Sequence, residues 1–78
     1  MMKVYGSHLC PDTCEAIEKL EKQNGEFQFC NISEDLTYFK EFLAIRDTED
    51  LYKEIREKHG IGIPCFVLED GTITFNID

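Results

Sequence analysis

Apolar residues along this chain fall into short continuous runs and into stripes at helical spacing. The short runs predict buried strands at residues 2–5, 27–32 and 65–68. A fourth strand is predicted at residues 72–75, where the character of the side chains alternates. The Asp70-Gly71 pair before it is typical of a tight hairpin turn.

The first helical stripe follows the first strand. Pro11 suits the first helical turn because its missing N–H has no partner there in any case. Cys14, Ile17 and Leu20 recur on one face, and Asn24-Gly25 predicts a left-handed end to the helix.

Two more helices are predicted between the second and third strands. The helix that begins near Ser33 has its apolar stripe at Leu36, Phe39, Phe42 and Leu43. We expect it to break at residues 46–48, with Thr48 capping a further helix that carries Leu51, Ile55 and Lys58 and ends at His59-Gly60.

The predicted order is therefore β-α-β-α-α-β-β in a single domain over residues 1–78. A helical crossover joins the first two strands, so they should be parallel and right-handed. The last two strands should form an antiparallel hairpin. The fold class is α/β, with a four-stranded mixed sheet flanked by helices.

Size and charge narrow the classes of function. The chain has 78 residues and a formal net charge of -8, which argues against nucleic acid and anionic membranes as partners. It has no apolar run of about 18 residues and no signal-peptide core. We expect a monomer in the cytoplasm.

The chemistry-bearing motif is Cys10-Pro11-Asp12-Thr13-Cys14 at the start of the first helix. A helix N-terminus favours an anion, so a thiol there favours its thiolate form, the nucleophile of thiol–disulfide exchange. Three residues separate Cys10 from Cys14. On one helix face their Cβ atoms would lie roughly 5–6 Å apart, which a disulfide tolerates only if Cys10 occupies the non-helical cap position.

Several residues near this motif, and the other two cysteines, also need an interpretation. His8 lies two residues before Cys10 and either supports the thiolate or is an exposed loop histidine. Thr13 is expected to contact solvent or to cap the helix. Cys65 is a buried strand cysteine, a third redox thiol or a metal ligand, and Cys30 reads as a core residue.

These residues resemble the glutaredoxin-like branch of the thioredoxin superfamily. Cys10-Pro11 and Cys14 after a strand, with Gly62-Ile63-Pro64 before a hairpin, carry the resemblance over nearly the whole chain. The closest pattern is that of small bacterial glutaredoxin-related proteins with a five-residue motif.

The resemblance implies a thioredoxin-like fold and a thiol–disulfide oxidoreductase. Cys10 would be the attacking thiolate and Cys14 the resolving thiol, acting on a protein or small-molecule disulfide. Pro64 would be a cis-proline facing the active-site sulfur, and the backbone of Ile63 would pair with the substrate. We place His8, Ile63 and Pro64 in the substrate-binding site.

The family's glutathione site is incomplete in this sequence. Glutaredoxins usually carry a glycine pair and an acidic residue after the hairpin, whereas residues 74–78 here read Thr-Phe-Asn-Ile-Asp. The final glutaredoxin helix is expected to be absent. No bound cofactor is expected, and glutathione and a thioredoxin-reductase-type enzyme both remain candidate reductants.

Two alternatives stay open. A thiolate metal-binding module for copper or zinc would use Cys10 and Cys14 with His8 or Cys65. A redox-inactive interaction domain would keep the fold alone.

Overall fold

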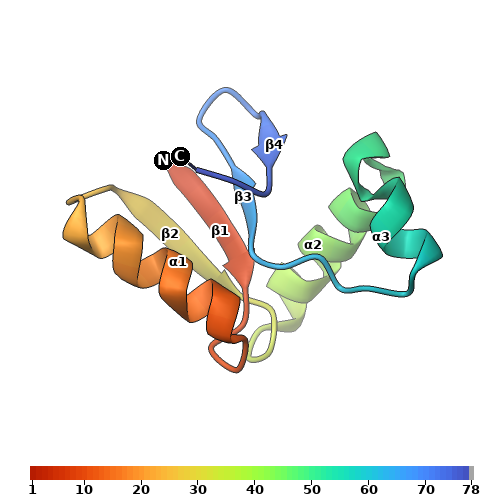
Figure 1. Cartoon of the computed structure of the whole chain (residues 1–78), viewed down its shortest axis with the longest axis horizontal. Coiled ribbons are helices and arrows are strands. Elements are labelled where there is room, and N and C mark those ends of the chain that lie inside the picture. The colour runs from red at the N-terminus through yellow and green to blue at the C-terminus, as the bar shows by residue number, and fades with distance from the viewer. Residues whose placement is uncertain (78) are drawn as a thin grey trace.

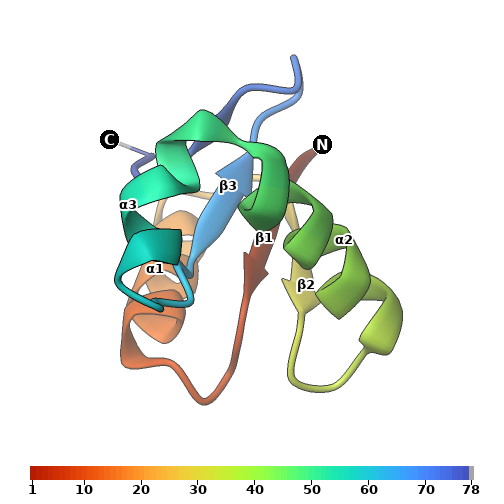
Figure 2. The same cartoon turned by 90° about the vertical axis from the view of Figure 1, so that its right-hand side faces the viewer.

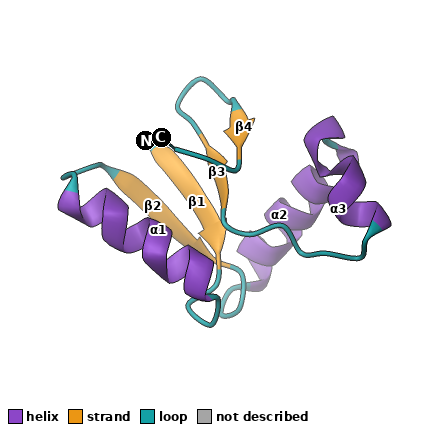
Figure 3. Cartoon of the chain, in the orientation of Figure 1, coloured by secondary structure: helices purple, strands orange, loops and turns teal. Residues whose placement is uncertain are grey.

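The structure is a computed structural model that describes residues 1–77. Its elements follow the predicted order (Figures 1 and 3), with a short 3-10 helix, η1, between the last two helices. In chain order they are β1 (Met2–Gly6), α1 (Pro11–Lys22), β2 (Phe27–Asn31), α2 (Leu36–Thr48), η1 (Asp50–Tyr52), α3 (Lys53–Glu57), β3 (Cys65–Val67) and β4 (Ile73–Thr74).

The strands form one mixed sheet in the order β2-β1-β3-β4. Strands β1 and β2 are parallel, as a helical crossover requires, with Val4 opposite Phe29. Strand β3 runs antiparallel to both of its neighbours and pairs Phe66 with Val4 and with Thr74. The predicted fold class, an α/β domain with a four-stranded mixed sheet, is confirmed.

Helices cover both faces of this sheet. Helix α1 lies on one side and helices α2 and α3 lie on the other (Figures 1 and 2). Successive strand residues point to opposite faces, so Val4 packs toward Leu20 of α1 whereas Tyr5 packs toward Phe42 of α2. The sheet therefore separates two small cores.

The predicted ends of α1 and α3 are confirmed. Asn24 has a φ of 54°, and the Gly25 N–H donates to the Leu20 carbonyl at 2.9 Å. His59 has a φ of 58°, and the Gly60 N–H donates to the Ile55 carbonyl at 2.8 Å. Both helices end in the left-handed turn that satisfies their last carbonyls.

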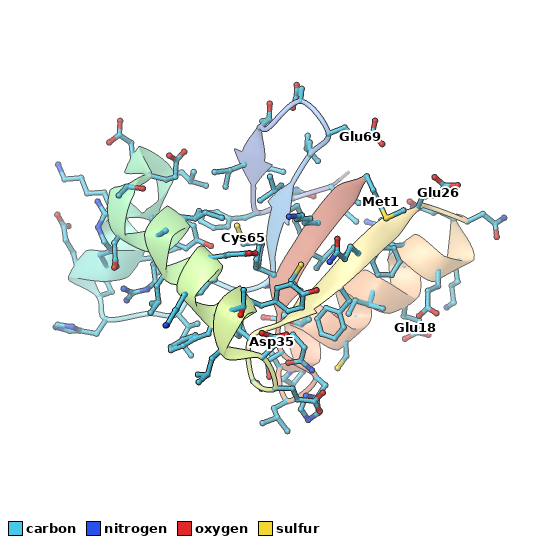
Figure 4. The ribbon with its side chains drawn as sticks, turned by 180° about the vertical axis from the view of Figure 1, so that it is seen from behind. Met1, Glu18, Glu26, Asp35, Cys65 and Glu69 are labelled. Atoms are coloured by element: carbon cyan, nitrogen blue, oxygen red, sulfur yellow. The ribbon has the colours of Figure 1, made fainter. Side chains whose placement is uncertain are left out.

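Helix α2 begins and ends close to the predicted positions, but Thr48 does not have its expected role. Its N-cap is Asp35, whose carboxylate accepts from the Thr37 N–H at 2.8 Å and which lies at the near end of α2 in Figure 4. The expected break falls at the end of residues 46–48, because the helix continues through Thr48 and Glu49 is its C-cap. The Thr48 hydroxyl donates back to the Ala44 carbonyl at 2.6 Å and so does not cap a following helix.

The predicted apolar stripe of α2 is also largely wrong. Phe42 is 1% exposed, but Leu36 is 73% exposed and Phe39 is 37% exposed. The α2 residues that pack against the core beside Phe42 are Tyr38 and Ile45, so the buried face of the helix differs from the predicted one.

The chain beyond β4 forms no helix over residues 75–77. The expected absence of a final glutaredoxin helix concerns residues 75–78, of which Asp78 lies outside the described part of the chain. Within residues 1–77, none of the helices is long and apolar enough to cross a membrane.

Candidate active site

Cys10 lies at the junction between the loop after β1 and helix α1. It is the N-cap residue of α1, with φ of -98° and ψ of 117°, and Pro11 is the first helical residue. The Cys14 N–H donates to the Cys10 carbonyl at 3.1 Å, which closes the first helical turn. Cys10 is thus non-helical, the condition that a Cys10–Cys14 bridge requires, and both thiols are unpaired in this structure.

Cys14 lies on the exposed side of α1. The sequence placed it on the apolar stripe with Ile17 and Leu20, and this is wrong because Cys14 is exposed. Its thiol donates to the backbone carbonyl of His8 at 3.3 Å. The second thiol is therefore accessible to solvent and held toward the loop that precedes Cys10.

Thr13 occupies the buried position that Cys14 does not. It is 0% exposed, so the expectation of a solvent-facing or capping threonine is wrong. Its hydroxyl accepts from the Ser7 N–H at 3.4 Å, and its side chain packs against Gly6 of β1. The face of α1 that meets the sheet is Thr13, Ala16 and Leu20.

The loop between β1 and Cys10 is held in place by short-range hydrogen bonds. The Cys10 N–H donates to the Ser7 carbonyl at 3.0 Å, and the Leu9 N–H donates to the Ser7 hydroxyl at 3.1 Å. The Ser7 hydroxyl also forms a hydrogen bond with the hydroxyl of Ser33, in the segment after β2. These contacts fix the approach of the chain to the cysteine.

His8 is directed toward the segment after β2. Its Nδ1 atom lies 2.9 Å from the Asn31 side-chain nitrogen and 3.8 Å from the Glu34 carboxylate. The His8 ring therefore contacts the segment after β2 and not the cysteine pair. His8 is linked to that pair through its backbone carbonyl, which accepts from the Cys14 thiol. The imidazole is about half exposed, which matches the interpretation as an exposed loop histidine.

The segment before β3 forms the second half of the site. The Ile63–Pro64 peptide bond is cis, as the family resemblance implied. Gly62 has a φ of 83°, and its carbonyl accepts from the Tyr52 hydroxyl at 2.5 Å. The Tyr52 ring fills the space where a Cβ of residue 62 would lie, so this position requires glycine for its backbone angle and for space.

A groove of about 450 Å³ joins α1 to this segment. It is lined by Asp12, Glu15, Ala16 and Lys19 of α1, by Ile55 and residues 62–64, by Phe66 of β3, and by Phe75, Asn76 and Ile77. The structure thus brings Ile63 and Pro64 to the same groove as the first turns of α1. The two cysteines are not lining residues, but Asp12 lies two positions after Cys10.

The other two cysteines lie in the core. Cys30 and Cys65 are both 0% exposed, and Cys65 lies on β3 where α2 passes the sheet (Figure 4). Burial raises the pKa of both thiols above the ordinary value, and the Cys65 thiol is in hydrogen-bond contact with the Tyr52 hydroxyl. The prediction of buried strand cysteines is confirmed.

The sequence also offered Cys10 and Cys14, with His8 or Cys65, as metal ligands. Cys65 packs with the α2-side core, on the sheet face opposite to α1. Over residues 1–77, no three His, Cys, Asp or Glu side chains are arranged to hold a metal ion.

Sequence reasoning missed four contributors to the site. Thr13 could have been found from its spacing to Ala16 and Leu20, which is helical with a period of three to four residues. Tyr52 lies in a segment of mostly charged residues, which predicts a solvated helix face. Phe75 and Ile77 come to the groove only through the tertiary fold. No local pattern signals those three residues.

The chain has a distant relative among known proteins. No protein-family model matches it, and no solved structure matches it. An uncharacterized protein of Haemophilus influenzae is 22% identical over 74 residues, which cover 95% of this chain and 86% of that protein. The similarity extends over most of both chains, and the description of the relative names no activity.

Proposed function

We propose that this protein is a glutaredoxin-like thiol–disulfide oxidoreductase with a thioredoxin-like fold. The observation that carries the proposal is the position of Cys10 at the N-cap of α1, next to a groove whose other wall contains cis-Pro64. The sheet order β2-β1-β3-β4, with β3 antiparallel to its neighbours, supports the fold assignment.

The chemistry begins at the Cys10 sulfur. Cys10 stands at the start of α1, whose first N–H groups have no partner within the helix, and it reacts as a thiolate. The thiolate attacks one sulfur of a substrate disulfide, a Cys10–substrate disulfide forms, and the other substrate sulfur leaves as a thiolate that takes a proton from water.

Cys14 completes the exchange. It gives up its hydrogen bond to the His8 carbonyl, loses its proton to solvent, and attacks the Cys10 sulfur. The second substrate thiolate leaves and is protonated. In total, two thiols of the protein become one disulfide, and one substrate disulfide becomes two thiols, so that two electrons pass to the substrate.

The cysteine pair must then be reduced again. Two glutathione thiols or a thioredoxin-reductase-type enzyme would supply the two electrons. The glycine pair of the usual glutathione site is missing from the sequence, and Phe75 and Ile77 lie in the groove in its place. A reducing cytoplasm is the compartment in which such a cycle operates.

Trapping of the mixed disulfide tests this function. Reduced Cys14→Ser protein is mixed with hydroxyethyl disulfide, and the adducts are located by mass spectrometry. The Cys14→Ser variant should accumulate one adduct on Cys10, whereas the native protein should release it and form the Cys10–Cys14 disulfide.

Cys10→Ser is the matched control, because it keeps the exposed thiol and removes the proposed nucleophile. It should react at Cys14 more slowly and at the rate of an ordinary exposed cysteine. Equal adduct formation in both variants, or no internal disulfide in the native protein, would contradict the oxidoreductase and favour the redox-inactive alternative.

A further inference from the structure

The groove that follows Cys10 along α1 has both apolar and acidic lining residues. Ala16, Pro64 and Phe66 are among the apolar ones, and Asp12 and Glu15 contribute carboxylates from the first turns of α1. These two residues are three positions apart on α1, so their side chains are neighbours on one helix face.

The cation in the groove lies further from Cys10. Lys19 follows Glu15 by one helical turn, and it already has an interaction of its own. Of the charged residues that α1 contributes to the groove, the two carboxylates are therefore the closest in sequence to Cys10, in a chain whose formal net charge is -8. The local charge and the net charge have the same sign, so they act together on an approaching partner.

The rim of the site is apolar as well. Leu9, immediately before Cys10, is 75% exposed, and Ile61, two residues before Ile63, is 60% exposed. Exposed apolar side chains next to residues of an apolar groove suit contact with another polypeptide. A small polar thiol such as glutathione leaves this apolar area largely uncovered.

We propose that this groove selects protein disulfides in which a basic residue and an apolar residue flank the reacting cysteine. The apolar side chain packs against Pro64 and Phe66, and the basic side chain lies against Asp12 and Glu15. Glutathione disulfide, which carries a net negative charge, is disfavoured by the same carboxylates. This inference rests on the proposed oxidoreductase function and names its substrate class.

The test compares two short peptides that differ in one charge. Each carries a cysteine joined by a disulfide to mercaptoethanol, with leucine on one side and either lysine or glutamate on the other. The rate at which each peptide disulfide oxidises the Cys10–Cys14 pair is measured by acid quench and mass spectrometry. Each rate is divided by the rate with hydroxyethyl disulfide, which is neutral, so that changes in the intrinsic reactivity of Cys10 cancel.

In the native protein, the lysine peptide should react about three- to tenfold faster than the glutamate peptide at low salt, the effect expected of two exposed carboxylates. The ratio should fall toward one in high salt. It should also fall toward one in the Asp12→Asn, Glu15→Gln double variant. Replacing the leucine of the peptide by glycine should slow both peptides.

A charge-matched variant separates the effect of the groove carboxylates from the effect of the net charge of the protein. Glu21→Gln with Glu26→Gln removes the same two charges from exposed positions that do not line the groove. It should keep most of the lysine preference. If the two double variants lose the preference equally, or if the native ratio is one, the groove does not select cations and the inference is wrong.

The outcome also distinguishes this inference from the function on which it rests. Reaction of hydroxyethyl disulfide at Cys10 with no charge preference overturns the substrate class alone. No reaction of any of these disulfides at Cys10 overturns the oxidoreductase, and the substrate class with it.

Discussion

Thr13 of α1 packs so closely against Gly6 of β1 that a side chain on Gly6 has no room. A Cβ atom on Gly6 would lie 2.5 Å from the Thr13 Cγ2 atom and 2.6 Å from its Oγ1 atom. Real Cβ atoms do not approach other heavy atoms so closely. The start of α1, and with it Cys10, is therefore positioned by direct contact of the helix with the sheet.

Gly6→Ala should destabilise the protein by about 1–3 kcal/mol, because the new methyl group must displace the buried Thr13. Urea unfolding followed by circular dichroism measures the change. Gly25→Ala is the matched control, since a Cβ there meets Leu20 only at 3.4 Å, and it should change stability by less than about 0.5 kcal/mol.

A double-mutant cycle identifies the contact as the cause. In the Thr13→Ala background the clashing atoms are gone, so Gly6→Ala should cost clearly less than in the native protein. An equal cost in both backgrounds would mean that another neighbour of Gly6 opposes the methyl group.

The same contact explains which part of α1 could be predicted from sequence. The helix and its ends follow from Pro11 and Asn24-Gly25, and both are where the pattern placed them. Its buried face was predicted wrongly, because counting Cys14 and Ile17 as buried places them where Thr13 and Ala16, each one residue earlier, pack against the sheet, while Leu20 belongs to both faces. Threonine is buried instead, since its methyl fits the space above Gly6 and its hydroxyl finds the Ser7 N–H.

The groove could not be predicted from local patterns. Its walls come from α1, from the segment before β3 and from residues 75–77, which are distant in sequence. The cis bond at Ile63–Pro64 came from family resemblance, since composition gives no signal for it. Leu36 and Phe39 have helical spacing yet remain exposed, because the face of α2 that packs against the core carries Tyr38, Phe42 and Ile45 instead.

Tyr52→Phe should destabilise the protein by about 1–2 kcal/mol, since the Gly62 carbonyl loses its donor and the Cys65 thiol loses a polar partner. The ring remains, so the space beneath Gly62 stays filled. The midpoint of urea unfolding measures the change.

Tyr38→Phe is the control for a lost hydroxyl. The Tyr38 hydroxyl accepts from the exposed Gln28 side chain at 2.8 Å, where water replaces the bond, so its removal should change stability by less than about 0.5 kcal/mol. Equal effects of the two substitutions would show that the Tyr52 hydroxyl does not hold the segment before β3.

The reduced protein should lose stability as the pH rises above about 9. Burial raises the pKa of Cys30 and Cys65 in the folded protein above the ordinary value of 9.0. Above that pH, the unfolded chain releases these protons while the folded chain keeps them, so the unfolded state is favoured. Each thiol should contribute a slope of about -1.4 kcal/mol per pH unit until it also ionises in the folded state.

Urea unfolding at a series of pH values between 7 and 10 measures this slope. Stability should stay level up to the ionisation of the unfolded thiols and then fall. Cys65→Ala is less stable at every pH, because it leaves a cavity, but its slope above pH 9 should be shallower. An unchanged slope would exclude Cys65 as a source of the alkaline instability.

Alkylation should separate the four cysteines into two reactive and two protected thiols. Cys14 is exposed and Cys10 partly exposed, whereas Cys30 and Cys65 are completely buried and burial raises their pKa. An alkylating reagent needs both access and a thiolate. Iodoacetamide on the reduced native protein at pH 8 should therefore label Cys10 and Cys14 at least about tenfold faster than the buried pair, because the latter react only through opening of the fold.

Peptide mass spectrometry locates the labels, and denatured protein, in which all four should react at similar rates, is the control. Early labelling of Cys65 would mean that the segment after Pro64 opens readily, which this packing around Tyr52 does not allow.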